Sequence, residues 1–438
     1  MPFLLSMAWR NTLRNSRRTA LTAATVLSGT ALLTVGLSWV NGIQNTFFGE
    51  ASRVVGHVRV VTDGWMARER LMPLYENIPR SEALVRAVAA APGVIAVYPR
   101  IMMGVTASKD GEEIGEVFGM AVGAPLTYYA DVLHLPEHIA TGAWFAPAAP
   151  GAAEGGGGES EGGARGQALV GHTLADQMGV RAGEEAIFIG QTQDGSMAPI
   201  RVRVQGIVDT GNGVYDKQIY LDLDQARWMV DVPEGCLELL VFGEDPADAR
   251  ALEAAVAPRL AAAEAAAGLA ADRHLVAQAW DTREPFASMS RIIGAMVSII
   301  SGIIVLITGL GVLNTMLMSV LERTAEIGVL RAMGMRGRAL VLMFITEALI
   351  ISALGGAVGV GLGSIGSLIM ESHGIDLGGL ASKMPNTLPV NRIIHGDWEP
   401  RIALLAFLLG LAMALVGAVS PALRATRIAP VTAMRARR

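Results

Sequence analysis

Four long apolar segments constrain this chain more than any other feature of its sequence. Each has about the 20 residues that a helix needs to cross the roughly 30 Å hydrocarbon layer of a membrane. Only 17% of the 438 residues are charged, whereas soluble domains carry about a quarter. We therefore predict an integral membrane protein with four transmembrane helices. These helices are expected at residues 19–40, 291–320, 339–370 and 402–420.

Arginines beside these segments predict the orientation of the chain. They gather in residues 1–18, in the short connection 321–338 and in the tail 421–438. Short loops rich in Lys and Arg stay in the cytoplasm. We therefore expect both termini in the cytoplasm and the regions 41–290 and 371–401 on the outer side. The first of these stretches also alternates apolar and basic side chains, which is typical of a short helix in the membrane interface.

The outer region 41–290 is long enough for one or two folded domains. Its periodicity predicts a mixture of helices and strands, and therefore an α+β fold. Within it, residues 146–166 are mostly Gly, Ala and Glu, which cannot build a core, so we expect a disordered surface loop. The expected strands are 54–62, 94–100, 116–122, 186–189, 200–208 and 218–223. The expected helices are 81–91 and an amphipathic segment at 250–272 that Pro258 interrupts.

Several classes of function lack their signatures in this sequence. A net charge of −5 argues against a nucleic-acid binder, and the single Cys236 excludes a disulfide framework within the chain. The sequence contains no P-loop, so ATP-driven work would need an ATPase on another polypeptide. His134 and His138 surround Pro136, which is unlike the unbroken helix of a zincin. We expect no catalytic residues, no metal and no cofactor bound by this chain, which is therefore not an enzyme.

The third apolar segment contains small residues at every fourth position. Gly355, Gly359 and Gly363 lie on one face of a helix and permit close packing against another helix in lipid. The pattern G-x-G-x-x-G at 361–366 overlaps this stretch. A dinucleotide-binding loop follows a strand, whereas this pattern lies inside an apolar helix, so we interpret it as a packing feature.

Two polar side chains lie inside apolar segments. Glu347 is an acid within the third segment, and such acids are functional candidates by default. A structural contact at the cytoplasmic interface and a role in coupling are both open for it. Asn314 in the second segment is expected to form a hydrogen bond between helices.

The connection 321–338 is the most informative stretch. Ile327, Leu330 and Met333 are spaced three apart and can form one apolar stripe on a helix, and Gly334 offers a stop signal. The stretch is either a solvated connecting helix or a helix docked into a cytoplasmic partner, and an exposed apolar stripe favours docking. The candidate docking residues are Glu322, Arg323, Glu326, Ile327, Leu330, Arg331, Met333 and Gly334.

The stretch ERTAEIGVLRAMG at 322–334, followed by Glu347 and the glycine-rich third segment, resembles permease subunits of ABC transporters. The resemblance is to the FtsX/MacB/Lol type, also called type VII, and the ending SPALRATRIAP at 420–430 shares it. The order of one span, a large outer domain and three spans agrees. The sequences NGIQN at 41–45 and GHV at 56–58 look closest to the lipoprotein-releasing LolC/LolE branch.

The resemblance implies a fold and a set of partners. The fold would be four membrane helices with a MacB-like α+β periplasmic core domain inserted between the first two, in the bacterial inner membrane. Two permeases, identical or different, would pair. Two copies of an ABC ATPase, which binds ATP and Mg, would dock on the coupling helix at 322–334.

The resemblance also implies a mechanism. ATP-driven motion of the spans would reach the outer domain and release a lipoprotein from the outer leaflet, with or without a periplasmic carrier. The candidate substrate and lipid region comprises Val40, Asn41, Ile43, Phe47, Met289 and Ile293. The alternatives are MacB-like efflux or peptide export, and FtsX-like regulation of an envelope enzyme without transport.

Overall fold

A computed structural model describes residues 16–109, 117–146, 166–322, 324–376 and 393–426. The chain divides into two compact units, which are described separately. The helical unit comprises residues 1–46, 291–376 and 393–438. The sheet unit comprises residues 47–290 and 377–392.

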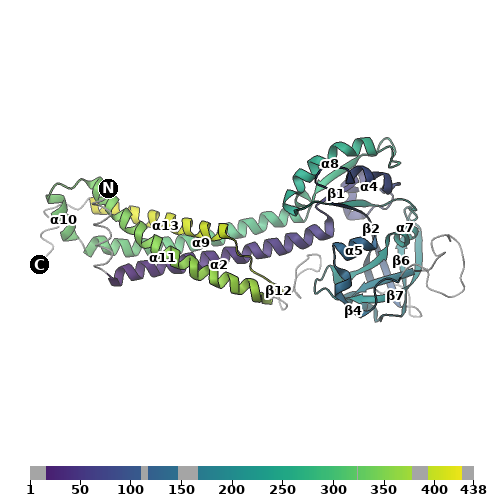
Figure 1. The fold of residues 1–438 in the computed structure, drawn as a ribbon, viewed down its shortest axis with the longest axis horizontal. Helices are drawn as coiled ribbons and strands as arrows, with labels where there is room; N and C mark the ends of the chain where they lie inside the picture. Colours follow the sequence, from purple (N-terminus) through teal and green to yellow (C-terminus); the bar gives the residue numbers. More distant parts are fainter. Residues whose placement is uncertain (1–15, 110–116, 147–165, 323, 377–392, 427–438) are drawn as a thin grey trace. The chain divides into compact units, whose positions relative to one another are not determined.

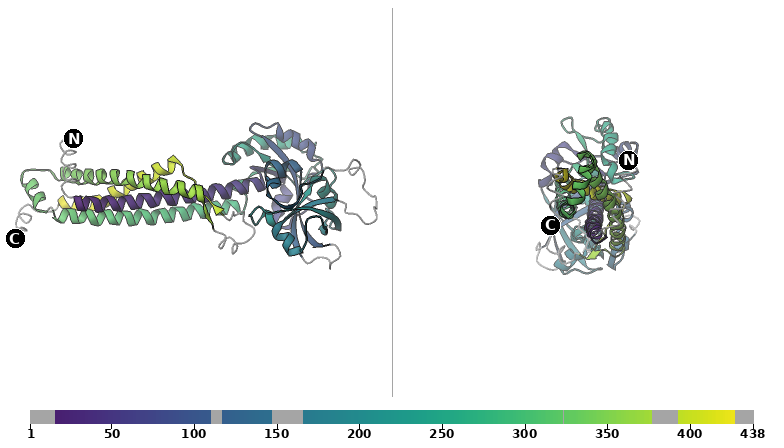
Figure 2. Two further views of the ribbon diagram at one scale, coloured as in Figure 1. Left: turned by 60° about the horizontal axis from the view of Figure 1, so that its bottom comes forward. Right: turned by 90° about the vertical axis from the view of Figure 1, so that its left-hand side faces the viewer.

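Four long helices have the length and apolar character to cross a membrane, as the sequence predicts. Those parts that belong to the helical unit run side by side (Figures 1 and 2). Every helix is longer than its apolar run, because hydrophobicity alone does not mark where a helix ends. The helices are α2 (Ser16–Val55), α9 (Phe286–Glu322), α11 (Gly337–His373) and α13 (Pro400–Thr426).

Two apolar clusters hold the helical unit together. The first joins Val26 of α2 and Met316 of α9 to Ile351 of α11 and Ala414 of α13. The second gathers side chains around Phe344 and includes the short helix α10 (Thr324–Ala332). A two-stranded pair, β11 (Ile375–Asp376) and β12 (Ile393–Ile394), completes the described part of this unit.

The sheet unit is built on ten strands in the order β10-β1-β9-β2-β3-β8-β5-β7-β4, with β6 pairing to both β2 and β7. Only β3–β8 and β5–β7 are parallel pairs among these strands. The strands are β1 (Val58–Thr62), β2 (Ala96–Lys109), β3 (Val117–Ala124), β4 (Ile139–Gly142), β5 (Gly166–Gly171), β6 (Glu185–Gln191), β7 (Met197–Val208), β8 (Gln218–Asp222), β9 (Glu238–Phe242) and β10 (Leu275–Ala279).

The long strand β2 joins the two parts of this sheet. Its first residues, 96–100, pair with β9, and its later residues, 101–107, pair with β3. Short helices cover the sheet, and α4 and α8 lie together beside β1 (Figure 1). These helices are α3 (Asp63–Arg68), α4 (Ser81–Ala89), α5 (Leu126–Asp131), α6 (His172–Met178), α7 (Leu223–Val230) and α8 (Ala249–Ala263). Single 3-10 turns are η1 (Glu69–Leu71), η2 (Leu135–His138), η3 (Tyr215–Lys217), η4 (Pro246–Asp248) and η5 (Trp280–Thr282).

Two cores fill the sheet unit. The larger one is aliphatic and includes the alternate buried residues of β7. The smaller one is rich in buried aromatic side chains, and the hydroxyls of Tyr129 and Tyr220 donate hydrogen bonds to backbone carbonyls. Its largest members are Tyr128, Tyr129, Phe145, Tyr215, Tyr220 and Phe242.

The structure corrects several predicted boundaries. Residues 54–55 belong to α2 and not to a strand, because the helix continues until Gly56, which has a φ of +75°. Helix α8 runs through Pro258 instead of being interrupted there. Strand β9 was not predicted, because its continuous apolar run cannot be told from a buried helix by periodicity. Strands β4, β5 and β10 were also not predicted.

Two sequence predictions fall mainly outside the described residues. The interfacial helix predicted at 1–18 is described only from Ser16, where α2 already begins. The loop predicted at 146–166 is described only at its two ends. There the Ala146 amide donates a hydrogen bond to the Gln167 side-chain oxygen at 2.7 Å.

Candidate functional site

The predicted coupling stretch forms the nine-residue helix α10 between α9 and α11. Ile327 is only 1% exposed, because it packs with Leu340 and Phe344 of α11 and Ala422 of α13. Leu330 is half-buried. The predicted stripe of Ile327, Leu330 and Met333 is therefore not one exposed face, since the helix buries one side against its own unit.

The outward side of this region carries different residues. Met333 is 72% exposed and Val329 is 47% exposed, and Glu322 and Glu326 are also exposed. Gly334 has a φ of +91° and ends the turn that follows α10, a conformation that favours glycine. Arg323 lies outside the described residues. An apolar pair flanked by acids is thus available for a partner.

Arg331 does not point into that outward surface but acts within the helical unit. Its guanidinium donates a hydrogen bond to the backbone carbonyl of Thr426, the last residue of α13. The last carbonyls of a helix lack intrahelical donors and carry partial negative charge, so a cation stabilises them. Arg331 therefore fixes the end of α13 next to α10.

The small residues of α11 lie against α2. A side chain at Gly355, Gly359 or Gly363 would come within 2.7, 2.5 or 2.8 Å of a backbone carbonyl oxygen of α2. These oxygens belong to Ala23, Leu27 and Ala31, which are themselves four residues apart. The two backbones thus approach so closely that only glycine fits on the α11 side.

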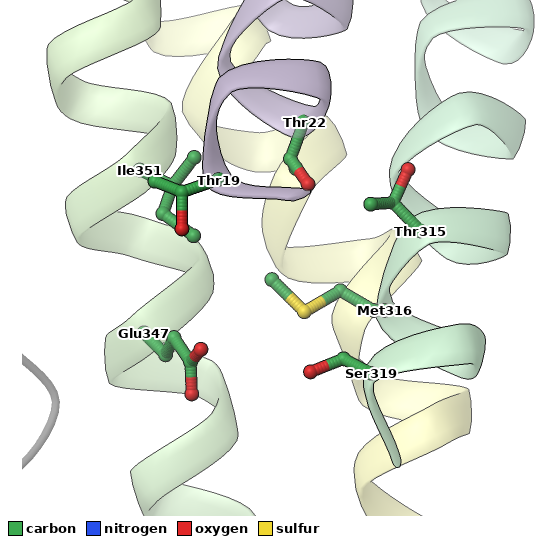
Figure 3. Close-up of a pocket in the computed structure, with 7 residues that line it drawn as sticks. All are labelled: Thr19, Thr22, Thr315, Met316, Ser319, Glu347 and Ile351. Carbon is green, nitrogen blue, oxygen red and sulfur yellow. The ribbon is translucent and has the colours of Figure 1, made fainter. Parts of the chain in front are cut away.

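Glu347 lies in a small pocket where α2, α9 and α11 meet, and it is 5% exposed (Figure 3). Hydroxyl groups from two other helices surround it. Such oxygens can donate hydrogen bonds to a carboxylate and join helices in lipid. The residues that line the pocket are Thr19, Thr22, Thr315, Met316, Ser319, Glu347 and Ile351.

Asn314 differs from its prediction. It is exposed on α9, and its side chain forms no hydrogen bond to another helix in the described part of the chain. The reason is that α9 packs through a different face, which carries Val312 and Met316.

Several residues of the predicted substrate and lipid region have structural roles. Asn41 and Asn45 donate hydrogen bonds from their amides to the carboxylate of Asp397, and the amide of Asp397 donates to the Ser38 carbonyl at 3.0 Å. Gly42 lies between them, and a side chain there would collide with the backbone of 395–397. The 41–45 sequence therefore docks the segment before α13 onto α2.

The other candidate residues of this region differ in how far their side chains are buried. Phe47 is 5% exposed and contacts Phe286, with ring centroids 6.3 Å apart. Met289 packs against the same cluster. Phe47 and Met289 are therefore core residues of the sheet unit. Half-buried positions are Val40, Ile43 and Ile293.

Sequence reasoning missed a buried ionic group in the sheet unit. Arg100 and Glu238 are each 2% exposed, and both guanidinium nitrogens Nε and Nη2 donate to Glu238 Oε1, at 3.0 and 2.9 Å. Arg59 donates to both carboxylate oxygens of Glu69, at 2.8 and 2.7 Å. A charged residue within an otherwise mostly apolar strand, as in VRVVT at 58–62, was the available signal.

No cluster of three or more His, Cys, Asp or Glu side chains suited to a metal occurs among the residues that the structure describes. His134 Nδ1 and Glu137 Oε1 lie 3.9 Å apart on an exposed turn.

Two family models match this chain, one over each of its two main parts. The FtsX-like permease C-terminal model matches residues 298–430, and the MacB-like periplasmic core domain model matches residues 19–259. The chain belongs to the FtsX-like permeases with a MacB-like periplasmic core domain. This result confirms the predicted fold class, namely apolar helices that could span a membrane with an inserted α+β domain.

Relatives of this permease carry export names. The pyoverdine export ATP-binding/permease protein PvdT of Pseudomonas fluorescens is 26% identical over 98% of this chain. The macrolide export ATP-binding/permease protein MacB of Brucella abortus is 36% identical over 35% of this chain and 21% of its own length. The permease spans 59% of the length of PvdT.

One solved structure that this chain matches is the periplasmic region of MacB from Actinobacillus actinomycetemcomitans. It covers 56% of this chain and 95% of its own, with 11% identity and a TM-score of 0.34.

Proposed function

We propose that this permease is the membrane subunit of an ATP-driven ABC exporter of the MacB-like kind. The observation that carries this proposal is the similarity to PvdT along 98% of the chain, because PvdT is named an ATP-binding/permease protein for export. ATP would be hydrolysed by an ABC ATPase, two copies of which would bind the permease pair. The arginines beside the helix ends support an inner-membrane location with cytoplasmic termini and a periplasmic sheet unit.

The ATPase would dock on the outward side of α10. Val329 and Met333 would supply the apolar anchors, and Glu322 and Glu326 would set the register on basic partner residues. Ile327 and Arg331 would transmit the force, since they join α10 to α11 and α13. Glu347 would link α2, α9 and α11 near this end, so that these helices respond together.

The second permease subunit would lie along α9. Only 17% of the most apolar window of α9 is buried within this chain, compared with 44% for α11. A helix this apolar and this uncovered needs lipid or another protein around it. The pair can be a homodimer or a heterodimer.

Lipoprotein release is the second candidate function. The NGIQN and GHV sequences at 41–45 and 56–58 favour it through their resemblance to the LolC/LolE branch. Asn41 and Asn45 already have a structural role in holding Asp397. The export names of the relatives therefore weigh more in our proposal, and lipoprotein release would require that acylated proteins bind this permease.

Affinity purification of the full chain in mild detergent, followed by mass spectrometry, tests the proposal. We expect an ABC ATPase to be retained in about equal amount to the permease. A retained periplasmic adaptor would support export, and retained acylated lipoproteins would support release. An envelope hydrolase in their place would indicate FtsX-like regulation. Absence of any ATPase, in a preparation that still contains the paired permease, would overturn the proposal.

A further inference from the structure

The end of α2 is held by side chains of the sheet unit, to which residues 47–55 belong. The last carbonyls of a helix need donors from outside the helix. The Tyr128 hydroxyl lies 3.0 Å from the carbonyl oxygen of Arg53 and donates to it. The Arg100 guanidinium donates to the carbonyl of Val54. Two orphan acceptors at the end of α2 are thus satisfied by buried side chains.

A third contact holds the same helix one turn earlier. The hydroxyl of Tyr215 donates to a carboxylate oxygen of Glu50 at 3.2 Å. The three donors come from three separate elements, because Arg100 lies on β2, Tyr128 on α5 and Tyr215 on η3. Strand β2 is the one that joins the two parts of the sheet. Hydrogen bonds from three elements of the sheet unit therefore hold the end of α2.

The charges around Arg100 make this attachment stronger. Glu238 interacts with Arg100, Arg283 and Arg59, and Arg59 and Arg283 share Glu69. Three guanidinium groups therefore face two carboxylates. The C-terminal end of a helix carries about half a negative charge, and Arg100 places its remaining donor there. The end of α2 thus supplies part of the negative charge that this buried group needs.

The protonation states agree with these roles. Burial raises the pKa of Tyr128 to about 12, so the hydroxyl keeps the proton that it donates. Burial alone would raise the pKa of Glu238, but the neighbouring Arg100 and then Arg283 and Arg59 outweigh it and hold that pKa below its ordinary value.

The beginning of α9 is held by apolar packing and by an ion pair, since Arg283, three residues before Phe286, bonds to Glu69. Phe286 packs on Phe47 in an apolar cluster that also contains Ala51, Val55 and Trp280. Apolar contacts are non-directional, whereas hydrogen bonds to a carbonyl weaken steeply when their angle changes. The hydrogen bonds at the end of α2 therefore fix its position more strictly than the apolar contacts of the same helix do.

We infer that a movement of α2 is transmitted to the sheet unit, and that Arg100, Tyr128 and Tyr215 are the positioning residues that hold the end of α2 there. The hydrogen bonds of these residues pass a displacement of α2 directly to β2, α5 and η3. This inference rests on the proposed function where it concerns ATP-driven motion. The attachment of α2 itself does not depend on that function.

The test compares two adjacent buried tyrosines. Tyr128→Phe removes the hydroxyl that bonds to α2. Tyr129→Phe is the matched control, because its hydroxyl bonds to the carbonyls of Val122 and Leu221, at 2.7 and 2.9 Å, within the sheet unit. Both side chains are at most 1% exposed. The measurement is amide hydrogen exchange of the full chain in lipid nanodiscs, followed in peptides that cover residues 47–55 and 238–242.

We expect exchange in residues 52–55 to rise about fivefold in Tyr128→Phe and to stay unchanged in Tyr129→Phe, since one buried hydrogen bond contributes about 1 kcal/mol. Adding Tyr215→Phe to the Tyr128→Phe variant should raise the exchange of residues 52–55 further. Residues 238–242 serve as the internal reference for loss of the whole fold. Equal exchange at residues 52–55 in the two single variants, or an equal rise at 238–242, would overturn the attachment.

A second arm tests the motion, with the ATPase that co-purifies with the permease. Tyr128→Phe combined with Tyr215→Phe should keep ATP hydrolysis but lose the ATP-dependent change of exchange in the sheet unit. A double variant that keeps this change would overturn the inference. If the wild-type chain shows no ATP response at all, the proposed function fails, and the exchange comparison of the first arm still decides whether α2 is fastened.

Discussion

Gly359 illustrates how single residues set the packing of this permease. An added side chain at this position would lie 2.5 Å from the Leu27 carbonyl oxygen and would also overlap Thr30. Neither a backbone oxygen nor a residue inside α2 can move aside cheaply. Gly361, two residues further, has open space where its side chain would be. The two glycines share one helix and one apolar environment and differ mainly in this contact.

We therefore predict that Gly359→Ala destabilises the full chain and Gly361→Ala does not. Overpacking costs about 1–3 kcal/mol, while alanine in an open helical position is favoured over glycine by about 1 kcal/mol. The midpoint of thermal unfolding in detergent should fall for Gly359→Ala and stay or rise for Gly361→Ala. Equal midpoints in the two variants would contradict the close approach of α11 to α2.

Residues of this kind are predictable from sequence to different degrees. The spacing of Gly355, Gly359 and Gly363 is local, so periodicity alone indicates a packing face. Arg100 and Glu238 are 138 positions apart and meet only through the pairing of β2 with β9. Without that pairing, a charge in an apolar strand gives no information about its partner.

At the level of elements, hydrogen bonds join α2 to the segment before α13. Asn41 and Asn45 carry a motif that the sequence associates with substrate, yet their bonding partner is Asp397, more than 350 positions away. The carboxylate accepts from both amides, and its own backbone amide is bonded to Ser38. A motif identifies residues that work together on one element, but the element against which they pack depends on the fold.

Removing this carboxylate should release the segment from α2. Hydrogen bonds to charged groups contribute about 1.5–3 kcal/mol, so Asp397→Ala should speed amide exchange in residues 395–399 at least tenfold. Arg401→Ala is the control, because Arg401 pairs with Glu399 but is 86% exposed, and exposed pairs contribute little. Exchange that is no faster in Asp397→Ala than in Arg401→Ala would show that the segment is held by other contacts.

The sequence predicts the elements of the membrane region better than those of the sheet unit. An apolar run of 20 residues has few alternatives to a membrane helix. Short strands such as β4 and β5 carry little periodicity and are defined by their neighbours. Helix α10 lies between these cases. Its existence follows from its pattern, but the side that it buries follows from the contacts of Ile327 with α11 and α13.

For the whole molecule, the contacts of Ile327 change where a cytoplasmic partner can bind. Val329 in α10 and Met333 just after it are exposed apolar side chains, at 47% and 72% exposure. Exposed apolar residues flanked by charges mark interaction sites, and anchors of this kind commonly contribute more than 1 kcal/mol each. We predict that the double variant Val329→Asp and Met333→Asp lowers retention of the ABC ATPase at least about thirtyfold and leaves folding intact, measured by co-purification and thermal unfolding. Met197→Asp is the control, since Met197 is 66% exposed on the sheet unit, which we propose to lie in the periplasm.

Ile327→Asp should instead unfold this end of the helical unit, because it buries a charge without a partner. Undiminished retention of the ATPase by the folded double variant would show that the partner binds elsewhere.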